Sequence, residues 1–259
     1  MSLDAHVDIL TSFAHSHFTG DPTRDAQIQL KITHSLEVLK NAERIIAGEG
    51  ITGKSTHLCR LAALYHDIGR FPQFARYATF NDRESTNHGR LGVLTLRELN
   101  LPGHTSVNDW RIIRFAVAQH NLKEIRAGLP KALRTPTMLV RDADKLDIFR
   151  VMIEHFSSDN PDPVVTHGFK DKPGEYTDAV YASVMEKKIS DYRLIQCAND
   201  FKLLIIGWLF NLHFSTSLKL LIQNGTINRI FSFLPKDVKI QALEKKIDAF
   251  IRYNSDCPS

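Results

Sequence analysis

The chain has 259 residues, which is enough for one large domain or two small ones. Hydrophobic residues make up 43% of it and charged residues 24%, as is typical of a globular protein with a buried core. The formal net charge is only +4, and lysine and arginine form no long run, so the composition argues against a nucleic-acid-binding tail. We therefore expect no stable complex with nucleic acid.

Cysteine usage and the apolar segments indicate the compartment. Cys59, Cys197 and Cys257 are far apart and form no Cys-x-x-Cys pair, which argues against a disulfide framework and against a cysteine-based zinc site. Such usage is typical of the reducing cytoplasm. The first 18 residues lack the features of a signal peptide, and the apolar stretch 203–214 is too short to span a membrane. We expect a cytoplasmic protein without a membrane partner, with 203–214 in a buried helix.

Helical periodicity dominates the chain in order, and strand-like alternation is nearly absent. The first strong helix is expected over 25–47, where apolar residues recur every three or four positions and glycines follow. Further helices are expected over 54–67, 84–99, 107–120 and 136–156, the last starting at a proline. The sequence therefore predicts an all-α helical core over residues 1–156.

The rest of the chain starts with a segment rich in Asp, Pro and Gly. This segment, 157–175, is expected to form a long loop or lid. Helices are expected again over 176–194, 198–223 and 236–253. We expect the C-terminal helices of residues 176–259 to pack on the core as part of the same domain.

The dipeptide His66-Asp67, in the sequence YHDIGRF, lies at the end of an expected helix. It supplies a nitrogen and a carboxylate ligand, and a divalent metal needs two or three more ligands from elsewhere. His34 lies at the edge of the apolar stripe of the first helix, and Asp144 lies four residues after Val140. Residues at this spacing share a helix face, and an ionised aspartate in a core is costly unless it is paired or binds a metal. The pattern predicts a metal site formed by His34, His66, Asp67 and Asp144.

Two further histidines follow the same pattern on the two helices in between. His88 is in line with Leu91 and later apolar positions, and His120 is in line with Ala116. A second ion could be held by Asp67, His88 and His120, with Asp67 bridging the two ions. The alternative for each histidine is a buried ring that donates to a backbone carbonyl.

The order of these residues resembles the HD superfamily of metal-dependent phosphohydrolases, in which a histidine is followed by a His-Asp pair and a distal aspartate. The tetrapeptide HDIG at 66–69 is a common form in bacterial members, and DADKLD at 142–147 is similar to the last motif of the family. The resemblance covers about residues 25–156. It implies an HD-domain helical bundle with additional C-terminal helices.

His88 and His120 resemble the positions that supply the extra ligands in the subgroup of this superfamily that binds two metals. That subgroup includes the HD-GYP phosphodiesterases of cyclic dinucleotides. The chain has Gln-His-Asn at 119–121 where those enzymes have His-His-Glu, and Gly-Leu-Pro at 128–130 is only loosely similar to Gly-Tyr-Pro. We therefore do not assign activity on cyclic dinucleotides. The (p)ppGpp hydrolases share the core, but their other domains are not found in this sequence.

Basic side chains are expected beside the metal site. A divalent metal lowers the pKa of bound water to about 7, and cations stabilise the oxygens of a phosphoryl transition state. Lys145 follows a predicted ligand directly, Arg70 follows HDIG, and Arg83 lies shortly before His88. We expect Asp67, Lys145 and Arg70 to be catalytic, and Lys145, Arg70 and Arg83 to bind the substrate. The alternative for each cation is an ordinary ion pair.

Two carboxylates that precede an expected helix, Asp82 and Glu84, are candidates for donating a proton to the leaving group, although such residues often cap the helix instead. The ligand set lacks a thiolate and suits Mn, Fe, Co, Ni or Zn, in one or two ions, better than Ca or Mg alone. These features favour hydrolysis of a phosphate monoester or diester, and we expect a small phosphorylated substrate, such as a nucleotide. Its base would lie against aromatic residues of the segment FPQFARYATF, 71–80, and the alternative for these rings is the protein core.

Two other functions stay open at this point. HD-type domains can act as non-catalytic signalling or binding modules, although all four core ligands are present here. Related HD enzymes use di-iron centres as oxygenases, and six candidate ligands would suffice for two ions. A homodimer also stays open as an alternative to a monomer.

Overall fold

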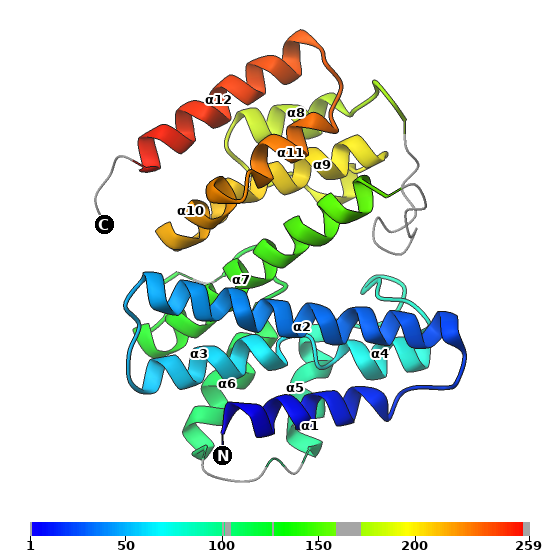
Figure 1. The fold of residues 1–259 in the computed structure, drawn as a ribbon, viewed down its shortest axis with the longest axis vertical. Helices are drawn as coiled ribbons and strands as arrows, with labels where there is room; N and C mark the ends of the chain where they lie inside the picture. Colours follow the sequence, from blue (N-terminus) through cyan, green and yellow to red (C-terminus); the bar gives the residue numbers. More distant parts are fainter. Residues whose placement is uncertain (1, 100, 102–104, 126, 159–171, 256–259) are drawn as a thin grey trace. The chain divides into compact units, whose positions relative to one another are not determined.

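The computed structural model describes residues 2–99, 101, 105–125, 127–158 and 172–255, and over these residues it contains helices and no strand. The expected all-α class is confirmed. The helices of Figure 1 are α1 (Leu3–His15), α2 (Pro22–Gly48), α3 (Lys54–Tyr65), α4 (Arg70–Tyr77), α5 (His88–Glu98), α6 (Val107–Gln119), α7 (Lys131–Phe156), α8 (Asp178–Met185), η1 (Tyr192–Leu194), α9 (Ala198–Gly207), η2 (Trp208–Asn211), α10 (Ser215–Gln223), α11 (Thr226–Ser232) and α12 (Val238–Ser255). The chain divides into two compact units, Met1–Asp147 and Ile148–Ser259, and the division falls within α7.

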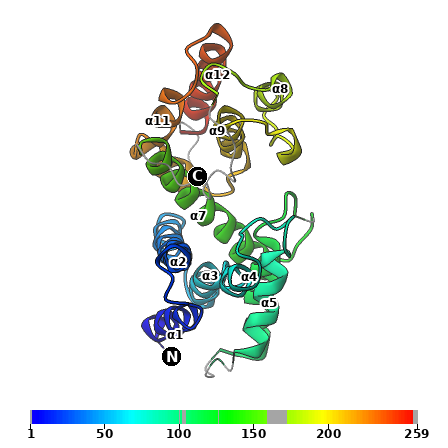
Figure 2. The ribbon, with the colours of Figure 1, turned by 90° about the vertical axis from the view of Figure 1, so that its right-hand side faces the viewer.

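The first unit is built around α2 and α3. The start of the long helix α2 is fixed by two features of the sequence. Pro22 occupies its first turn, and the side chain of the capping residue Asp21 accepts from the backbone N–H groups of Thr23 and Arg24. It packs against α3, which packs against α6, and α6 packs against α5. Helix α1 contacts both α2 and α3, as Figures 1 and 2 show. The apolar faces of these helices form the core of the unit, and His34, His66 and Asp67 are buried in it.

The HDIG segment ends on Gly69 because the backbone of α5 leaves no room there for a Cβ atom. A Cβ atom at this position would meet the carbonyl oxygen of His88 and would lie 2.5 Å from the backbone nitrogen of Gly92. The backbone at the start of α4 therefore packs directly against the backbone of α5, with no room for a side chain at Gly69. This contact brings the His66-Asp67 dipeptide next to the first turn of α5.

Several helices of this unit differ from the sequence prediction. Helix α1 was not predicted, and α5 starts at His88 instead of residue 84. Helix α4 was not predicted, because Pro72 favours the end of a helix; the structure places it in the first turn, where proline is tolerated. Helix α7 starts at Lys131 and contains Pro136, whereas the expected helix started at this proline. The extra turn leaves the register of the later residues unchanged, so Asp144 stays on the face that was predicted.

The second unit contains the C-terminal part of α7 and the helices from α8 to α12. The expected helix 198–223 is interrupted: α9 ends at Gly207, η2 follows, and α10 starts at Ser215. Much of the apolar stretch 203–214 is buried, and no helix in the described ranges is long and apolar enough to cross a membrane. Residues 159–171 of the expected loop or lid lie outside the described residues. The packing of the C-terminal helices on the core stays a prediction.

Candidate metal centre

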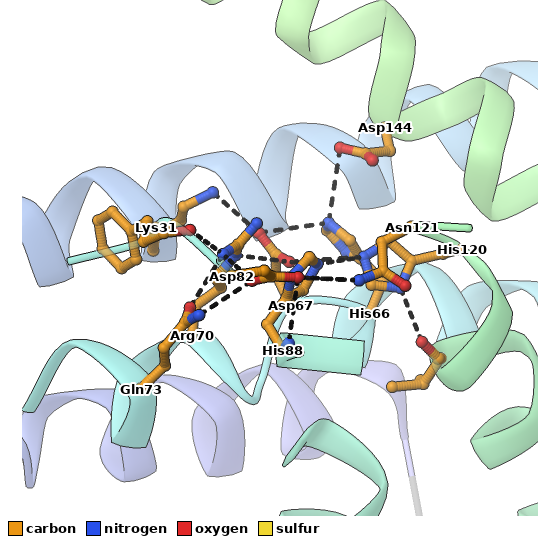
Figure 3. A network of polar contacts seen from close by, with 12 residues as sticks. Lys31, His66, Asp67, Arg70, Gln73, Asp82, His88, His120, Asn121 and Asp144 are labelled. Atoms are coloured by element: carbon orange, nitrogen blue, oxygen red, sulfur yellow. Dashed lines mark hydrogen bonds and ion pairs between the residues drawn. The ribbon is translucent and has the colours of Figure 1, made fainter. Parts of the chain in front are cut away.

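Four predicted ligands from three parts of the first unit meet at one point. The Nε2 atoms of His34 and His66 lie 3.2 Å apart. Oδ1 of Asp144 lies 3.2 Å from Nε2 of His34 and 3.7 Å from Nε2 of His66. Oδ2 of Asp67 lies 3.6 and 3.8 Å from the same two nitrogens. These atoms form the first ligand set, and most of the side chains are labelled in Figure 3.

The other oxygen of Asp67 faces a second set. Oδ1 of Asp67 lies 3.4 Å from Nε2 of His88 and 3.6 Å from Nε2 of His120. The two histidine nitrogens lie 3.0 Å apart. The structure therefore brings all six predicted ligands together, with Asp67 between the two sets, as the sequence suggested for a bridging residue.

Two of the histidines are oriented by the helix that they follow. His66 and His120 each cap a helix, and their Nδ1 atoms lie 2.8 and 2.7 Å from the backbone oxygens of Ala63 and Val117, three residues earlier. A carbonyl oxygen only accepts, so each Nδ1 carries a proton and donates it. In the neutral ring this leaves the lone pair on Nε2, which points to the ligand set.

The other two histidines are oriented by carboxylates. Nδ1 of His34 lies 2.6 Å from Oδ2 of Asp147, and Nδ1 of His88 lies 2.7 Å from Oδ2 of Asp82. Histidines that bind metals usually donate the other ring proton to a carboxylate or a backbone carbonyl. All four rings therefore have the orientation of metal ligands, with Nδ1 at an acceptor and Nε2 toward the cluster.

The geometry of the two sets fits a cation. Neutral rings with protonated Nδ1 atoms would put pairs of lone pairs face to face, at 3.2 Å for His34 and His66 and 3.0 Å for His88 and His120. Such contacts between acceptors are repulsive unless a positive charge lies between them. Two ligands about 2.1 Å from one ion, at a tetrahedral angle, lie about 3.4 Å apart, which is close to the distances observed. The residues present thus fit one or two divalent metal ions.

Burial and charge set the protonation states. Burial lowers the pKa of His66 to about 4, against the effect of Asp67 and Asp144. Burial and Arg70 lower the pKa of His88 to about 3. Burial raises the pKa of Asp67, but neighbouring cations outweigh it and hold the pKa well below its usual range. Two neutral imidazoles and an ionised carboxylate are the states that a metal ion requires.

Without a metal ion, the His34 ring is doubly protonated near neutral pH. Burial and Lys31 lower its pKa, but hydrogen bonds to Asp144 and Asp147 outweigh them and raise it to about 9. Burial likewise raises the pKa of Asp144, and the hydrogen bond from His34 and the nearby histidines lower it overall. A proton on His34 thus supplies one positive charge where a metal ion would supply two.

Of the predicted cations, Arg70 contacts a ligand directly. Its Nε lies 3.5 Å from Oδ1 of Asp67, and its Nη1 lies 3.0 Å from Oδ1 of Asp82. Lys145 is buried on α7, and burial lowers its pKa to about 8. Arg83 is exposed in the segment between α4 and α5. The roles of Lys145 and Arg83 stay predictions.

Asp82 and Lys31 contact metal ligands, and the sequence did not predict these contacts. Asp82 accepts from His88, Arg70, Asn121 and Gln73, and these contacts lower its pKa to about 2 against the effect of burial. The lowered pKa favours an ionised Asp82 that accepts hydrogen bonds, so its role as a proton donor stays an untested alternative. Lys31 contacts Asp67, and its position three residues before a ligand on α2 was the signal that could have identified it.

The aromatic residues after HDIG are mostly core. Phe71, Phe74 and Phe80 are buried, whereas Tyr77 is 41% exposed. Phe74 and Phe80 stack on each other with their ring centroids 4.7 Å apart. Three of the four rings that were expected to receive a nucleotide base therefore pack inside the protein instead.

Comparisons with known proteins agree with the geometry. The family model described as HD domain matches residues 32–148, a segment that contains all six ligands. Neither a curated protein nor a solved structure matches the chain. Among the six ligands, two groups of three have ligand atoms within 4.8 Å of one another and could each hold a metal ion. They are His34, His66 and Asp144, and His66, Asp67 and His120. Residues 32–148 of the chain form an HD domain.

Proposed function

We propose that the chain is a metal-dependent phosphohydrolase that uses water to cleave a phosphate monoester or diester. The single observation that carries the proposal is the convergence of four histidine Nε2 atoms on the two oxygens of Asp67, each histidine having its Nδ1 bonded to an acceptor. Divalent ions of the Mn, Fe, Co, Ni or Zn type suit such ligands. When bound, they supply Lewis acidity and a water of lowered pKa.

We assign the protein groups the following roles in this reaction. His34, His66, Asp67 and Asp144 hold one ion, and Asp67, His88 and His120 hold a second. Arg70, 15% exposed and beside Asp67, offers positive charge to a phosphoryl oxygen. Lys145 is a second candidate for that role.

The reaction consumes one water. The water oxygen forms a bond to phosphorus, the bond from phosphorus to the leaving oxygen breaks, and the leaving oxygen takes up one proton. Preorganised positive charge favours this step because the negative charge on the phosphoryl oxygens is stabilised where it develops. We keep a small phosphorylated molecule as the proposed substrate. A nucleotide is one member of that class, whose base would need a surface other than the buried rings of 71–80.

Metal analysis combined with a substrate screen tests the proposal. The purified full chain should carry a transition metal in stoichiometric amount, and with added divalent metals it should hydrolyse one or more phosphorylated metabolites. Asp67→Ala should remove both bound metal and hydrolysis. Asp178→Ala is the matched control, because Asp178 is an exposed carboxylate of α8 in the other unit.

Other results would lead to a different function. The sharing of Asp67 between two ligand sets also suits a pair of irons, so oxygen-dependent turnover of an iron-loaded chain would favour an oxygenase over a hydrolase. Stoichiometric metal without turnover of any kind would favour a binding or signalling module. A chain that binds no transition metal would contradict the proposal. The cytoplasmic location and a homodimer stay predictions.

A further inference from the structure

A lysine lies beside the carboxylate that the two ligand sets share. Nζ of Lys31, on α2, is 2.9 Å from Oδ2 of Asp67, and the lysine side chain is 18% exposed. Arg70 approaches the other oxygen of Asp67, and its side chain is 15% exposed. The Asp67 side chain is only 4% exposed. Both cations thus reach solvent from a carboxylate that is itself buried, and Figure 3 shows them on the same side of Asp67.

One aromatic ring holds both cations. Nζ of Lys31 lies 5.3 Å from the centroid of the Phe80 ring, and Cζ of Arg70 lies 5.9 Å from it. Contacts of this length to a ring face attract a cation. Phe80 is fixed in turn by stacking on Phe74. The fold therefore keeps two positive charges close together, although they repel each other.

Asp67 balances these charges only while its oxygens are free. In the proposed function both oxygens are ligands, so they can no longer serve as full partners for an ammonium and a guanidinium. Arg70 keeps other acceptors, because its Nη1 also donates to Asp82 and Gln73. The contacts of Lys31 in the described structure are Asp67 and the ring of Phe80. Lys31 is thus the cation that most needs a new anionic partner when Asp67 binds metal.

We propose that Lys31 is a substrate-binding residue, whose ammonium, together with Arg70, contacts the anionic oxygens of the phosphoryl group at the exposed edge of the ligand cluster. This inference rests on the proposed function. Lysine suits the role because its charge is a point charge on a flexible stem, which can turn from one oxygen to another. Arg70, which Asp82 and Gln73 hold in place, supplies the fixed part of the same anion site.

Calorimetric titration of two ligands, inorganic phosphate and manganese, tests the inference. The variants are Lys31→Met, Lys31→Arg and, as a matched control, Lys40→Met. Lys40 lies on the same helix, is 63% exposed and pairs with Glu37. In the manganese-loaded full chain, Lys31→Met should weaken phosphate binding about tenfold or more, as expected for a lost charged hydrogen bond. Lys31→Arg should retain most of the affinity, and Lys40→Met all of it.

The second titration separates binding from a purely structural role. Removing Lys31 removes a cation that competes for Asp67, so Lys31→Met should bind manganese as tightly as the wild-type chain or more tightly. Unchanged phosphate affinity in Lys31→Met would overturn the inference. So would a joint loss of manganese and phosphate binding, which would mean that Lys31 only supports Asp67.

Failure of the proposed function has a different signature. A wild-type chain that takes up no manganese contradicts the metal centre itself. That result also overturns the inference, because Lys31 keeps Asp67 as its partner when no metal binds. Failure of the inference alone has the opposite pattern: wild-type manganese uptake is normal, and phosphate affinity is equal in the wild-type chain and in Lys31→Met.

Discussion

Asp82 joins a ligand of the second set to a cation. Its carboxylate accepts from Nδ1 of His88 at 2.7 Å and from Nη1 of Arg70 at 3.0 Å. We expect Asp82→Asn to weaken binding at the second set by about tenfold to a hundredfold, the usual effect of losing a carboxylate behind a metal-binding histidine. At a metal concentration that just fills both wild-type sites, the stoichiometry measured by mass spectrometry should fall from two ions to one in Asp82→Asn. Asp178→Asn is the control, and full occupancy in Asp82→Asn would contradict this role.

The proton on His34 should be measurable when metal binds. Hydrogen bonds to Asp144 and Asp147 outweigh burial and raise its pKa to about 9, from 6.5. The stability that this proton gives the metal-free fold is therefore complete below pH 6.5 and is lost as the pH rises through about 9. Because a ligand histidine must be neutral, binding of the first ion at pH 7 should release about one proton.

Calorimetry in buffers of different ionisation enthalpy counts this proton. His34→Gln is the comparison, since glutamine carries no proton to release. If the wild-type chain releases none at pH 7, then His34 is neutral there and the assignment of the raised pKa is wrong.

At the scale of elements, the contact between the start of α4 and α5 depends on Gly69. A methyl group there would meet the backbone of His88 and Gly92. We expect Gly69→Ala to lower the free energy of unfolding by about 1–3 kcal/mol, because backbone cannot move aside as a side chain can. Urea unfolding measures the change. Gly207→Ala, where the nearest backbone oxygen would lie 3.4 Å from the new Cβ, should stay within about 1 kcal/mol of wild type. Equal effects of the two substitutions would contradict the close approach.

The positions of ligands on their helices were predictable, whereas some helix ends were not. Asp144 lies on the face that the spacing from Val140 indicated, since this periodicity is local. The predictions for α4 and for the start of α7 were wrong because both treated a proline as a helix boundary. A proline fits the first turn of a helix, where its missing N–H would have had no partner, and it fits a helix interior when tertiary packing offsets the lost hydrogen bond. Local pattern decides which face is buried more reliably than where a helix ends.

At the scale of the whole molecule, the two groups of described residues that could hold a metal both lie in the unit Met1–Asp147. A ligand that binds only the folded state stabilises it, by about 2.7 kcal/mol at a concentration one hundred times Kd. Removing metal with a chelator should therefore speed amide hydrogen exchange in α3 and α6 more than in α9 of the second unit. Hydrogen exchange followed by mass spectrometry measures this, and equal acceleration in both units would contradict a centre confined to the first.

The sequence by itself determined the helical class, the HD pattern and all six side chains that converge, because helical periodicity fixes which residues face the core. Only the tertiary structure decided the distances between ligands, the roles of Asp82 and Lys31 as their partners, and the burial of the aromatic segment after HDIG. These depend on contacts between residues far apart in the chain, such as Lys31 and Asp67. Local spacing carries no information on such contacts, since they arise from how the helices pack.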